Sequence, residues 1–203
     1  LTFGAATLPT WLTLLDNGDG SASLSGTPDN ADVGDHPVVL NVSDGTTTVN
    51  QSFTLTVENV NDAPIFSSTA ITAAIEDVAY NYTVMAEDID SGALIFGAAT
   101  LPTWLTLLDN GDGSASLSGA PDNADAGDQP VVLTVSDAFV TVEQSFTMTV
   151  TAVNDPPIFS STAITAAIED VAYNYTVTAS DEEGGALTFG AATLPTWLTL
   201  LDN

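Results

Sequence analysis

Short runs of alternating apolar and polar residues recur along the chain. In residues 80–84, 131–135 and 146–150, apolar side chains occupy every second position. This period of two predicts β-strands that turn one face inward. Because no window shows a sustained helical period, the pattern predicts an all-β fold of about seven antiparallel strands per structural unit.

Clusters of Gly, Asn, Asp and Pro separate these runs, at residues 88–92, 108–114 and 119–130. Such residues suit tight loops between strands. The stretch Asp109–Ser114, "DNGDGS", has the composition of a Ca²⁺ loop. Its glycines occupy positions where an EF-hand needs oxygen-bearing side chains, so a hairpin turn is the favoured interpretation.

The chain repeats itself with a fixed period. The stretch "TLPTWLTLLDN" begins at Thr7, Thr100 and Thr193, so each copy follows the previous one by 93 residues. An Asn-Asp-x-Pro elbow ends the repeat at residues 61–64 and again at 154–157. Because proline after Asn and Asp makes a stiff, extended joint, we predict domain boundaries after Asp62 and after Asp155.

Three parts follow from these boundaries. Residues 63–155 form one complete repeat, residues 1–62 the C-terminal part of a preceding repeat, and residues 156–203 the N-terminal part of a further repeat. A period of 93 residues is the size of a small β-sandwich. The near-identity of the copies indicates a recent duplication within a longer array.

One tryptophan recurs at the same offset in each copy, as Trp11, Trp104 and Trp197. Large aromatic side chains are usually buried, so Trp104 is predicted to fill the core of its repeat. An exposed tryptophan that stacks on a sugar is the alternative.

The charge composition is one-sided. The chain has 27 Asp and Glu residues, no Lys and no Arg, and a formal net charge of −27, yet 44% of its residues are hydrophobic, as in a folded protein. Repulsion between carboxylates must be relieved by spacing, protonation or bound ions, and metal cations are the obvious candidates. The lack of basic residues argues against nucleic acid and anionic membrane surfaces as partners. No apolar run is long enough to insert into a bilayer.

The motifs carry a resemblance to known repeats. The turn at Asp137 followed by a strand and the elbow resembles the end of a cadherin repeat, and "AEDIDSG" resembles its Asp-x-Asp turn. The segment from "LPTWLTL" to "PDNADVGD" is closer to the dystroglycan-type cadherin-like and immunoglobulin-like repeats of large bacterial or archaeal surface proteins. The resemblance implies tandem immunoglobulin-like or cadherin-like β-sandwiches.

In that family, Ca²⁺ ions lie at the joints between consecutive repeats. The resemblance implies that the first joint uses Asn61, Asp62, Asp88, Asp90 and Asp137, and that the second uses Glu76, Asn154, Asp155 and Asp181.

The chemistry of these residues suits such an ion, because Ca²⁺ takes six to eight oxygen ligands in irregular geometry. The motif is incomplete, however: Asn59 and Ala152 replace its first linker Asp, and Glu183 replaces Asp90 in the later copy. We therefore expect fewer ions per joint, or ions that bind more weakly. The alternative is that the Asp residues only form turns and keep the surface soluble.

Catalysis is disfavoured by composition. The one histidine, His36, becomes Gln129 in the next copy, and Cys, Lys and Arg are missing, so only a pair of carboxylates could act as acid and base. We therefore expect no enzyme. The sequence predicts a structural, extracellular array, the stalk or fibre of a cell-surface adhesin, stiffened by Ca²⁺ between neighbouring repeats.

Two alternatives remain open at this point. One is a glycan- or protein-binding adhesion module. The other is a metal-independent, filament-forming subunit, in which an uncovered edge strand such as Val140–Val153 pairs with another copy of the chain.

Overall fold

The computed structural model describes residues 1–90 and 92–202; Ser91, in a predicted turn, and Asn203, the last residue of the third part, lie outside it. The chain divides into two compact units, which are residues 1–65 with 86–95 and 135–142, and residues 66–85 with 96–134 and 143–203. Each linker therefore lies within a single unit, together with the acidic loops around it.

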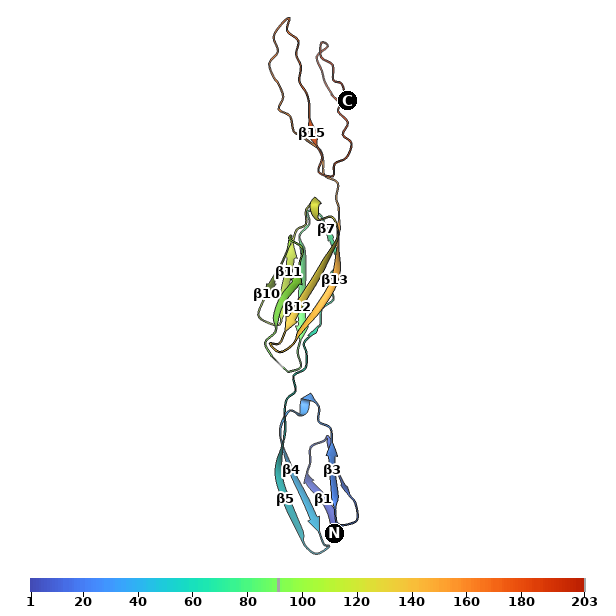
Figure 1. Ribbon diagram of the computed structural model, residues 1–203, viewed down its shortest axis with the longest axis vertical. Coiled ribbons are helices and arrows are strands. Elements are labelled where there is room, and N and C mark those ends of the chain that lie inside the picture. The colour runs from blue at the N-terminus through green and yellow to red at the C-terminus, as the bar shows by residue number, and fades with distance from the viewer. Residues whose placement is uncertain (91, 203) are drawn as a thin grey trace. The chain divides into compact units, whose positions relative to one another are not determined.

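The first part, residues 1–62, forms a three-stranded sheet and a separate hairpin. The sheet has the order β1-β4-β5, from β1 (Thr2–Thr7), β4 (Gly34–Ser43) and β5 (Thr48–Val57). The hairpin joins β2 (Leu12–Asp16) and β3 (Ala22–Gly26). Figure 1 shows these strands in blue to cyan.

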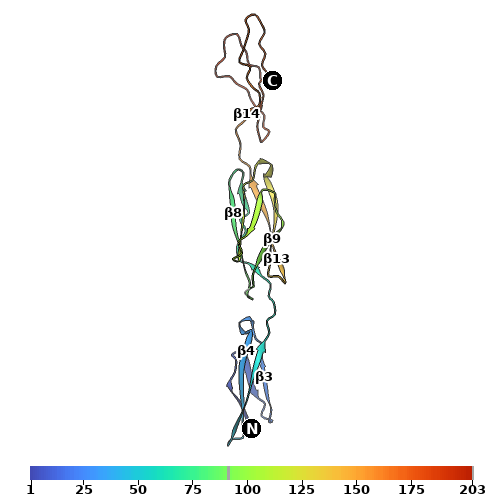
Figure 2. The same cartoon turned by 90° about the vertical axis from the view of Figure 1, so that its left-hand side faces the viewer.

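The complete repeat is a sandwich of two four-stranded sheets, with the orders β10-β11-β8-β6 and β7-β13-β12-β9. Figure 2 shows β8 in one layer and β9 with β13 in the other. The strands are β6 (Ile65–Phe66), β7 (Ala73–Ile75), β8 (Tyr80–Glu87), β9 (Ile95–Thr100), β10 (Leu105–Asp109), β11 (Ser114–Gly119), β12 (Gly127–Ser136) and β13 (Thr141–Thr151). The predicted all-β sandwich is confirmed.

Alternating side chains build the core between these sheets. Along β8 every second residue from Tyr80 is buried, and on β11 the buried Leu117 lies opposite Tyr82. The facing sheet contributes Leu133 from β12 and Met148 from β13, both almost fully buried. Burying one such side chain contributes about 1.5–3 kcal/mol, so the alternating apolar residues stabilise this sandwich.

The pairing of β13 differs in one respect from the all-antiparallel arrangement that the sequence predicts. The strands β7 and β13 run parallel, with Ala74 opposite Val150. The chain enters the second sheet at β7 and reverses direction only after β7. The next strand, β8, then begins in the first sheet, so β7 runs in the same direction as β13. The segment Val140–Val153 is covered only in part: β13 lies between β7 and β12, but the three-residue β7 pairs with it along Thr149–Thr151, which leaves Thr141–Met148 without a β7 partner.

The predicted hairpin turn at Asp109–Ser114 is confirmed. The strands β10 and β11 are antiparallel, and the Asn110 N–H donates to the Ser114 carbonyl at 3.0 Å. Gly111 has a φ of +74°, which glycine adopts without strain. The Asp109 carboxylate caps the turn by accepting the Gly111 N–H at 2.9 Å.

Trp104 packs at the edge of the core and is half-buried, so the prediction of a fully enclosed core residue is only partly right. Its ring meets Tyr80 edge to face, with 5.9 Å between centroids, and a Cβ on Gly119 would overlap its carbonyl oxygen. Burial raises the pKa of Tyr80 to about 12, and the Tyr80 hydroxyl donates to the Ile71 carbonyl at 2.8 Å.

The third part keeps local bonds of the complete repeat but few of its strands. The Tyr173 hydroxyl donates to the Ile164 carbonyl at 2.7 Å, as Tyr80 does to Ile71. Its strands are the two-residue β14 (Ile158–Phe159) and β15 (Ala179–Ser180), which pair with each other. Trp197 is 64% exposed here.

The helical elements of residues 1–90 and 92–202 are two 3₁₀ turns, η1 (Asn30–Asp32) and η2 (Asn123–Asp125). No helix in this described part is long and apolar enough to cross a membrane.

The turn after β12 contains a strained residue, and we predict that Ala138→Gly stabilises the protein. Ala138 has a φ of +81°, whereas its counterpart in the first part is Gly45, with a φ of +90°. A left-handed conformation costs a non-glycine residue about 1–2 kcal/mol, partly offset by the greater freedom of glycine in the unfolded chain. Urea denaturation should show a gain of about 0.5–1 kcal/mol. The reciprocal control, Gly45→Ala, should lose stability, and a gain there would contradict this account.

Candidate metal centres at the two linkers

The first linker is tied to the turn that follows β12. The Asn61 amide donates one bond to the Asp62 carbonyl at 2.7 Å and another to Asp137 Oδ2 at 2.8 Å. Asp137 is only 8% exposed, and its Oδ1 accepts the N–H groups of Phe139 at 2.8 Å and Val140 at 2.7 Å. This carboxylate is therefore held in place by donors on both of its oxygens.

These donors keep Asp137 charged. The Val140 N–H is the largest cause that lowers the pKa of Asp137, followed by the Asn61 amide, while burial opposes them. Hydrogen bonds to the charged form favour that form. The stabilisation is present above the usual Asp range and is lost as the pH falls through the lowered pKa.

A second chain of bonds runs from the linker to the turn after β8. The Asp62 N–H donates to Asp90 Oδ2 at 2.6 Å, and the Asp90 N–H donates to Asp88 Oδ1 at 2.7 Å. The other carboxylate oxygen of Asp88, Oδ2, is buried without any hydrogen-bond partner. A buried, unsatisfied carboxylate oxygen calls for an explanation, and a bound cation is one.

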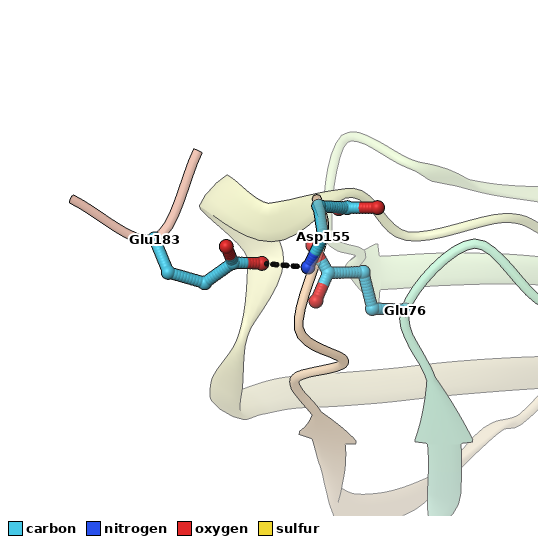
Figure 3. Close-up of side chains that lie close together, drawn as sticks. All are labelled: Glu76, Asp155 and Glu183. Atoms are coloured by element: carbon cyan, nitrogen blue, oxygen red, sulfur yellow. Dashed lines mark hydrogen bonds between the residues drawn. The ribbon is translucent and has the colours of Figure 1, made fainter. Parts of the chain in front are cut away.

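At the second linker three carboxylates converge. Glu76 is 1% exposed and its Oε2 accepts the Val153 N–H at 2.7 Å, while the Asp155 N–H donates to Glu183 Oε1 at 2.9 Å. One oxygen from each of Glu76, Asp155 and Glu183 lies within 4.8 Å of the other two. Figure 3 shows the side chains of Glu183 and Glu76 reaching toward Asp155 from either side.

The pKa of the neighbouring Glu182 is affected by the negative charge of this cluster. Burial raises the pKa of Glu182, and the charges of Asp155 and Glu76 raise it further. Since like charges repel each other, a bound divalent cation would stabilise this cluster.

All five residues predicted for the first linker thus lie in one hydrogen-bonded set. At the second linker, Glu76 and Asp155 come together, and the Asn154 amide bonds to the Asp155 carbonyl at 2.9 Å, as Asn61 does to that of Asp62. Asp181 does not belong to the group of three carboxylates, whereas Glu183 does. The signal for Glu183 was present in the sequence, because it stands 93 residues after Asp90.

Two asparagines in the "PDNAD" segments were not predicted to take part. The Asn30 amide lies within 3.2 Å of Asp62 Oδ2 and 3.4 Å of Asp90 Oδ1. The Asn123 amide donates to the Glu182 carbonyl at 2.9 Å. Within residues 1–90 and 92–202, three converging carboxylates occur only at the second linker. There the Asn123 amide bonds to a main-chain oxygen and not to a carboxylate.

The histidine position is structural. His36 Nε2 bonds to the Asp32 carbonyl at 2.5 Å, and Gln129 makes the same contact to Asp125 at 3.0 Å. Since an amide replaces the imidazole without loss of the bond, proton transfer is not what this position requires.

The side chains gathered at both linkers supply only oxygen ligands: carboxylates, amide oxygens and nearby carbonyls. Ca²⁺ prefers such ligands and tolerates irregular placement, whereas Zn²⁺ favours nitrogen and sulfur. Glu76, Asp155 and Glu183 fit a Ca²⁺ ion at the second linker, and Asp88 with its unpaired oxygen fits one at the first.

The chain matches one protein-family model, described as "Putative Ig domain", over residues 1–58 and again over residues 63–151. The two matches cover most of the chain and fall on the first part and the complete repeat. The immunoglobulin-like resemblance is thereby confirmed. No protein of curated function matches the chain.

Several solved structures are similar. An endo-fucoidan hydrolase from glycoside hydrolase family 107 is 31% identical with a TM-score of 0.43, over 75% of this chain and 23% of that one. The chain therefore spans about a quarter of that enzyme. Human protocadherin-24 EC1-2 is 20% identical with a TM-score of 0.48, over 76% of this chain and 82% of that one. The SrpA adhesin from Streptococcus sanguinis is 12% identical with a TM-score of 0.39, over 46% of this chain and 59% of that one.

We predict that Asn61→Ala raises the pKa of Asp137 without bringing it to the usual Asp range. The variant removes one donor and leaves the Val140 N–H, which contributes most. An NMR titration of the side-chain carboxyl carbons measures this directly.

Asp44 is a matched control for this titration. It occupies the same turn in the first part, and its pKa is lowered by the N–H groups of Thr47 and Thr46 rather than by an asparagine. Asn61→Ala should leave Asp44 unchanged. Equal shifts at Asp44 and Asp137, or no shift at either, would show that the Asn61 bond does not act on Asp137.

Proposed function

The chain belongs to the Putative Ig domain family, and from this premise we propose that it is a non-catalytic, structural array of repeats whose linkers are stiffened by Ca²⁺. The boundaries of the proposed repeats lie after Asp62 and Asp155. The proposed location is the cell surface or the extracellular space, as part of an adhesin-like protein.

One observation carries this proposal: the buried carboxylate of Glu76 meets those of Asp155 and Glu183 in a chain without Lys or Arg. Leaving an ionised group buried and unpaired costs several kcal/mol. No side chain with a fixed positive charge is available in this sequence to offset that cost. A divalent cation from solution can neutralise the cluster.

Such an ion would act mechanically as well as electrostatically. Glu76 precedes β8 of the complete repeat, Asp155 lies in the linker, and Glu183 follows β15 in the third part. An ion bound to all three would restrict the linker between them. It would also stabilise the folded form by mass action, because the unfolded chain lacks the site.

A catalytic role is not supported by the arrangement of these groups. One oxygen from each of the three carboxylates lies within 4.8 Å of the other two, and His36 and Gln129 make the same structural bond. We therefore propose that the repeats act as a spacer or support for other parts of an adhesin, with neighbouring repeats as their partners.

A second candidate, a protein- or glycan-binding adhesion module, rests on a different residue. Phe139 is 82% exposed on the strained turn beside Asp137, where the first part has Thr46. Trp104, by contrast, is half-buried and packs edge to face against Tyr80. If adhesion occurs in this segment, Phe139 is the side chain that we expect to carry it.

We predict that the 203-residue chain binds Ca²⁺ saturably in calorimetry and that Glu76→Gln weakens the site at the second linker at least about tenfold, because a neutral amide replaces a charged ligand. Circular dichroism would establish that the variant is folded. Glu143→Gln is the matched control, since Glu143 is exposed on β13 and its loss changes the net charge equally.

Three results would count against the proposal. They are no saturable binding by the wild type, equal effects of Glu76→Gln and Glu143→Gln, and NMR relaxation of the second linker that is identical with Ca²⁺ and with chelator. The first and last together would favour the metal-independent filament or spacer.

A further inference from the structure

We propose that Asn30 and Asn123 are metal-independent clamps, each joining a capped turn of one repeat to the acidic turn that follows the next linker. Asn30 lies in the first family match and Asp90 in the second, and both belong to the same compact unit. The inference concerns the protein without bound ions and so does not rest on the Ca²⁺ proposal.

The local structure holds Asn30 in place before it makes any long-range contact. Asp29 accepts the Ala31 N–H at 2.9 Å, and Asp32 reciprocally accepts the Asp29 N–H at 3.0 Å. This is a complete capping box on a single 3₁₀ turn. The turn η2 repeats it, with bonds of 2.9 Å and 3.1 Å around Asp122. Both asparagines stand at the first residue of such a turn.

From this position Asn30 meets two carboxylates. Its Nδ2 atom is 3.2 Å from Asp62 Oδ2 and 3.4 Å from Asp90 Oδ1, and the Asp62 N–H donates to Asp90 Oδ2. Two carboxylates side by side repel each other unless a donor lies between them. In a chain without Lys or Arg, a side-chain amide is one of the uncharged donors available, and it brings no charge that needs its own partner.

The second linker repeats the clamp with a different acceptor. The Asn123 amide donates to the main-chain carbonyl of Glu182 at 2.9 Å. The sequence change from Asp90 to Glu183 accompanies this difference. The carboxylates of Asp155 and Glu183 are thereby left to converge with Glu76, while the turn is still held by an amide bond.

The test is amide hydrogen exchange by NMR on the full 203-residue chain in EDTA. In Asn30→Asp a third carboxylate replaces the donor at nearly equal size, so the bond between the Asp62 N–H and Asp90 should open more often. We expect the protection of the Asp62 N–H to fall on the order of tenfold, and by less in Asn30→Ala, which removes the donor without adding charge. The Ala31 N–H reports whether η1 itself remains intact.

Asn123→Asp is the matched control. It should leave the protection of the Asp62 N–H unchanged and lower that of the Asp155 N–H. Unchanged protection of Asp62 in both Asn30 variants, with η1 intact, would overturn the clamp and leave Asn30 as a turn residue only. Because no Ca²⁺ is present, this result is independent of whether the linkers bind the ion.

Discussion

The constraint on which the rest of this structure depends is the lack of any fixed side-chain cation beside 27 carboxylates. Each carboxylate must find N–H or O–H donors, face water, or share an ion. Many find donors close by. Asp112, for example, has its pKa lowered first by the Ser114 hydroxyl. Local capping by backbone and hydroxyl groups thus replaces the salt bridges that other proteins use.

Near the linkers, local donors do not satisfy every carboxylate. Asp137 is satisfied by two backbone N–H groups and an amide, whereas Asp88 keeps one buried oxygen without a partner and Glu76 faces two other carboxylates. The linker N–H groups of Asp62, Val153 and Asp155 each already donate to one carboxylate. The amide clamp and the divalent ion that we propose would each relieve the remaining repulsion between carboxylates, and the clamp would do so without metal.

The near-identical copies show how far context decides structure. Residues 80–87 form the eight-residue strand β8 between β11 and β6, while the matching residues 173–180 form strand only at Ala179–Ser180. Both copies keep the bond from the first tyrosine hydroxyl to an Ile carbonyl. Short local bonds therefore form from sequence alone, whereas a ladder requires partner strands to pair and a facing sheet to bury its apolar side.

The sequence by itself determined what is local or periodic: the repeat of 93 residues, the alternating faces of β8, β12 and β13, the hairpin at Asp109–Ser114, and the gathering of Asn61 and Asp62 with acidic turns. These follow from period, turn chemistry and a resemblance between motifs. Only the tertiary structure decided that β7 runs parallel to β13 and that Asn30 reaches Asp90. The period of 93 residues pointed to Glu183, but the fold decided that Glu183 meets Glu76. Those outcomes depend on the direction in which a strand enters a sheet and on distances between residues far apart in the chain, which no local pattern encodes.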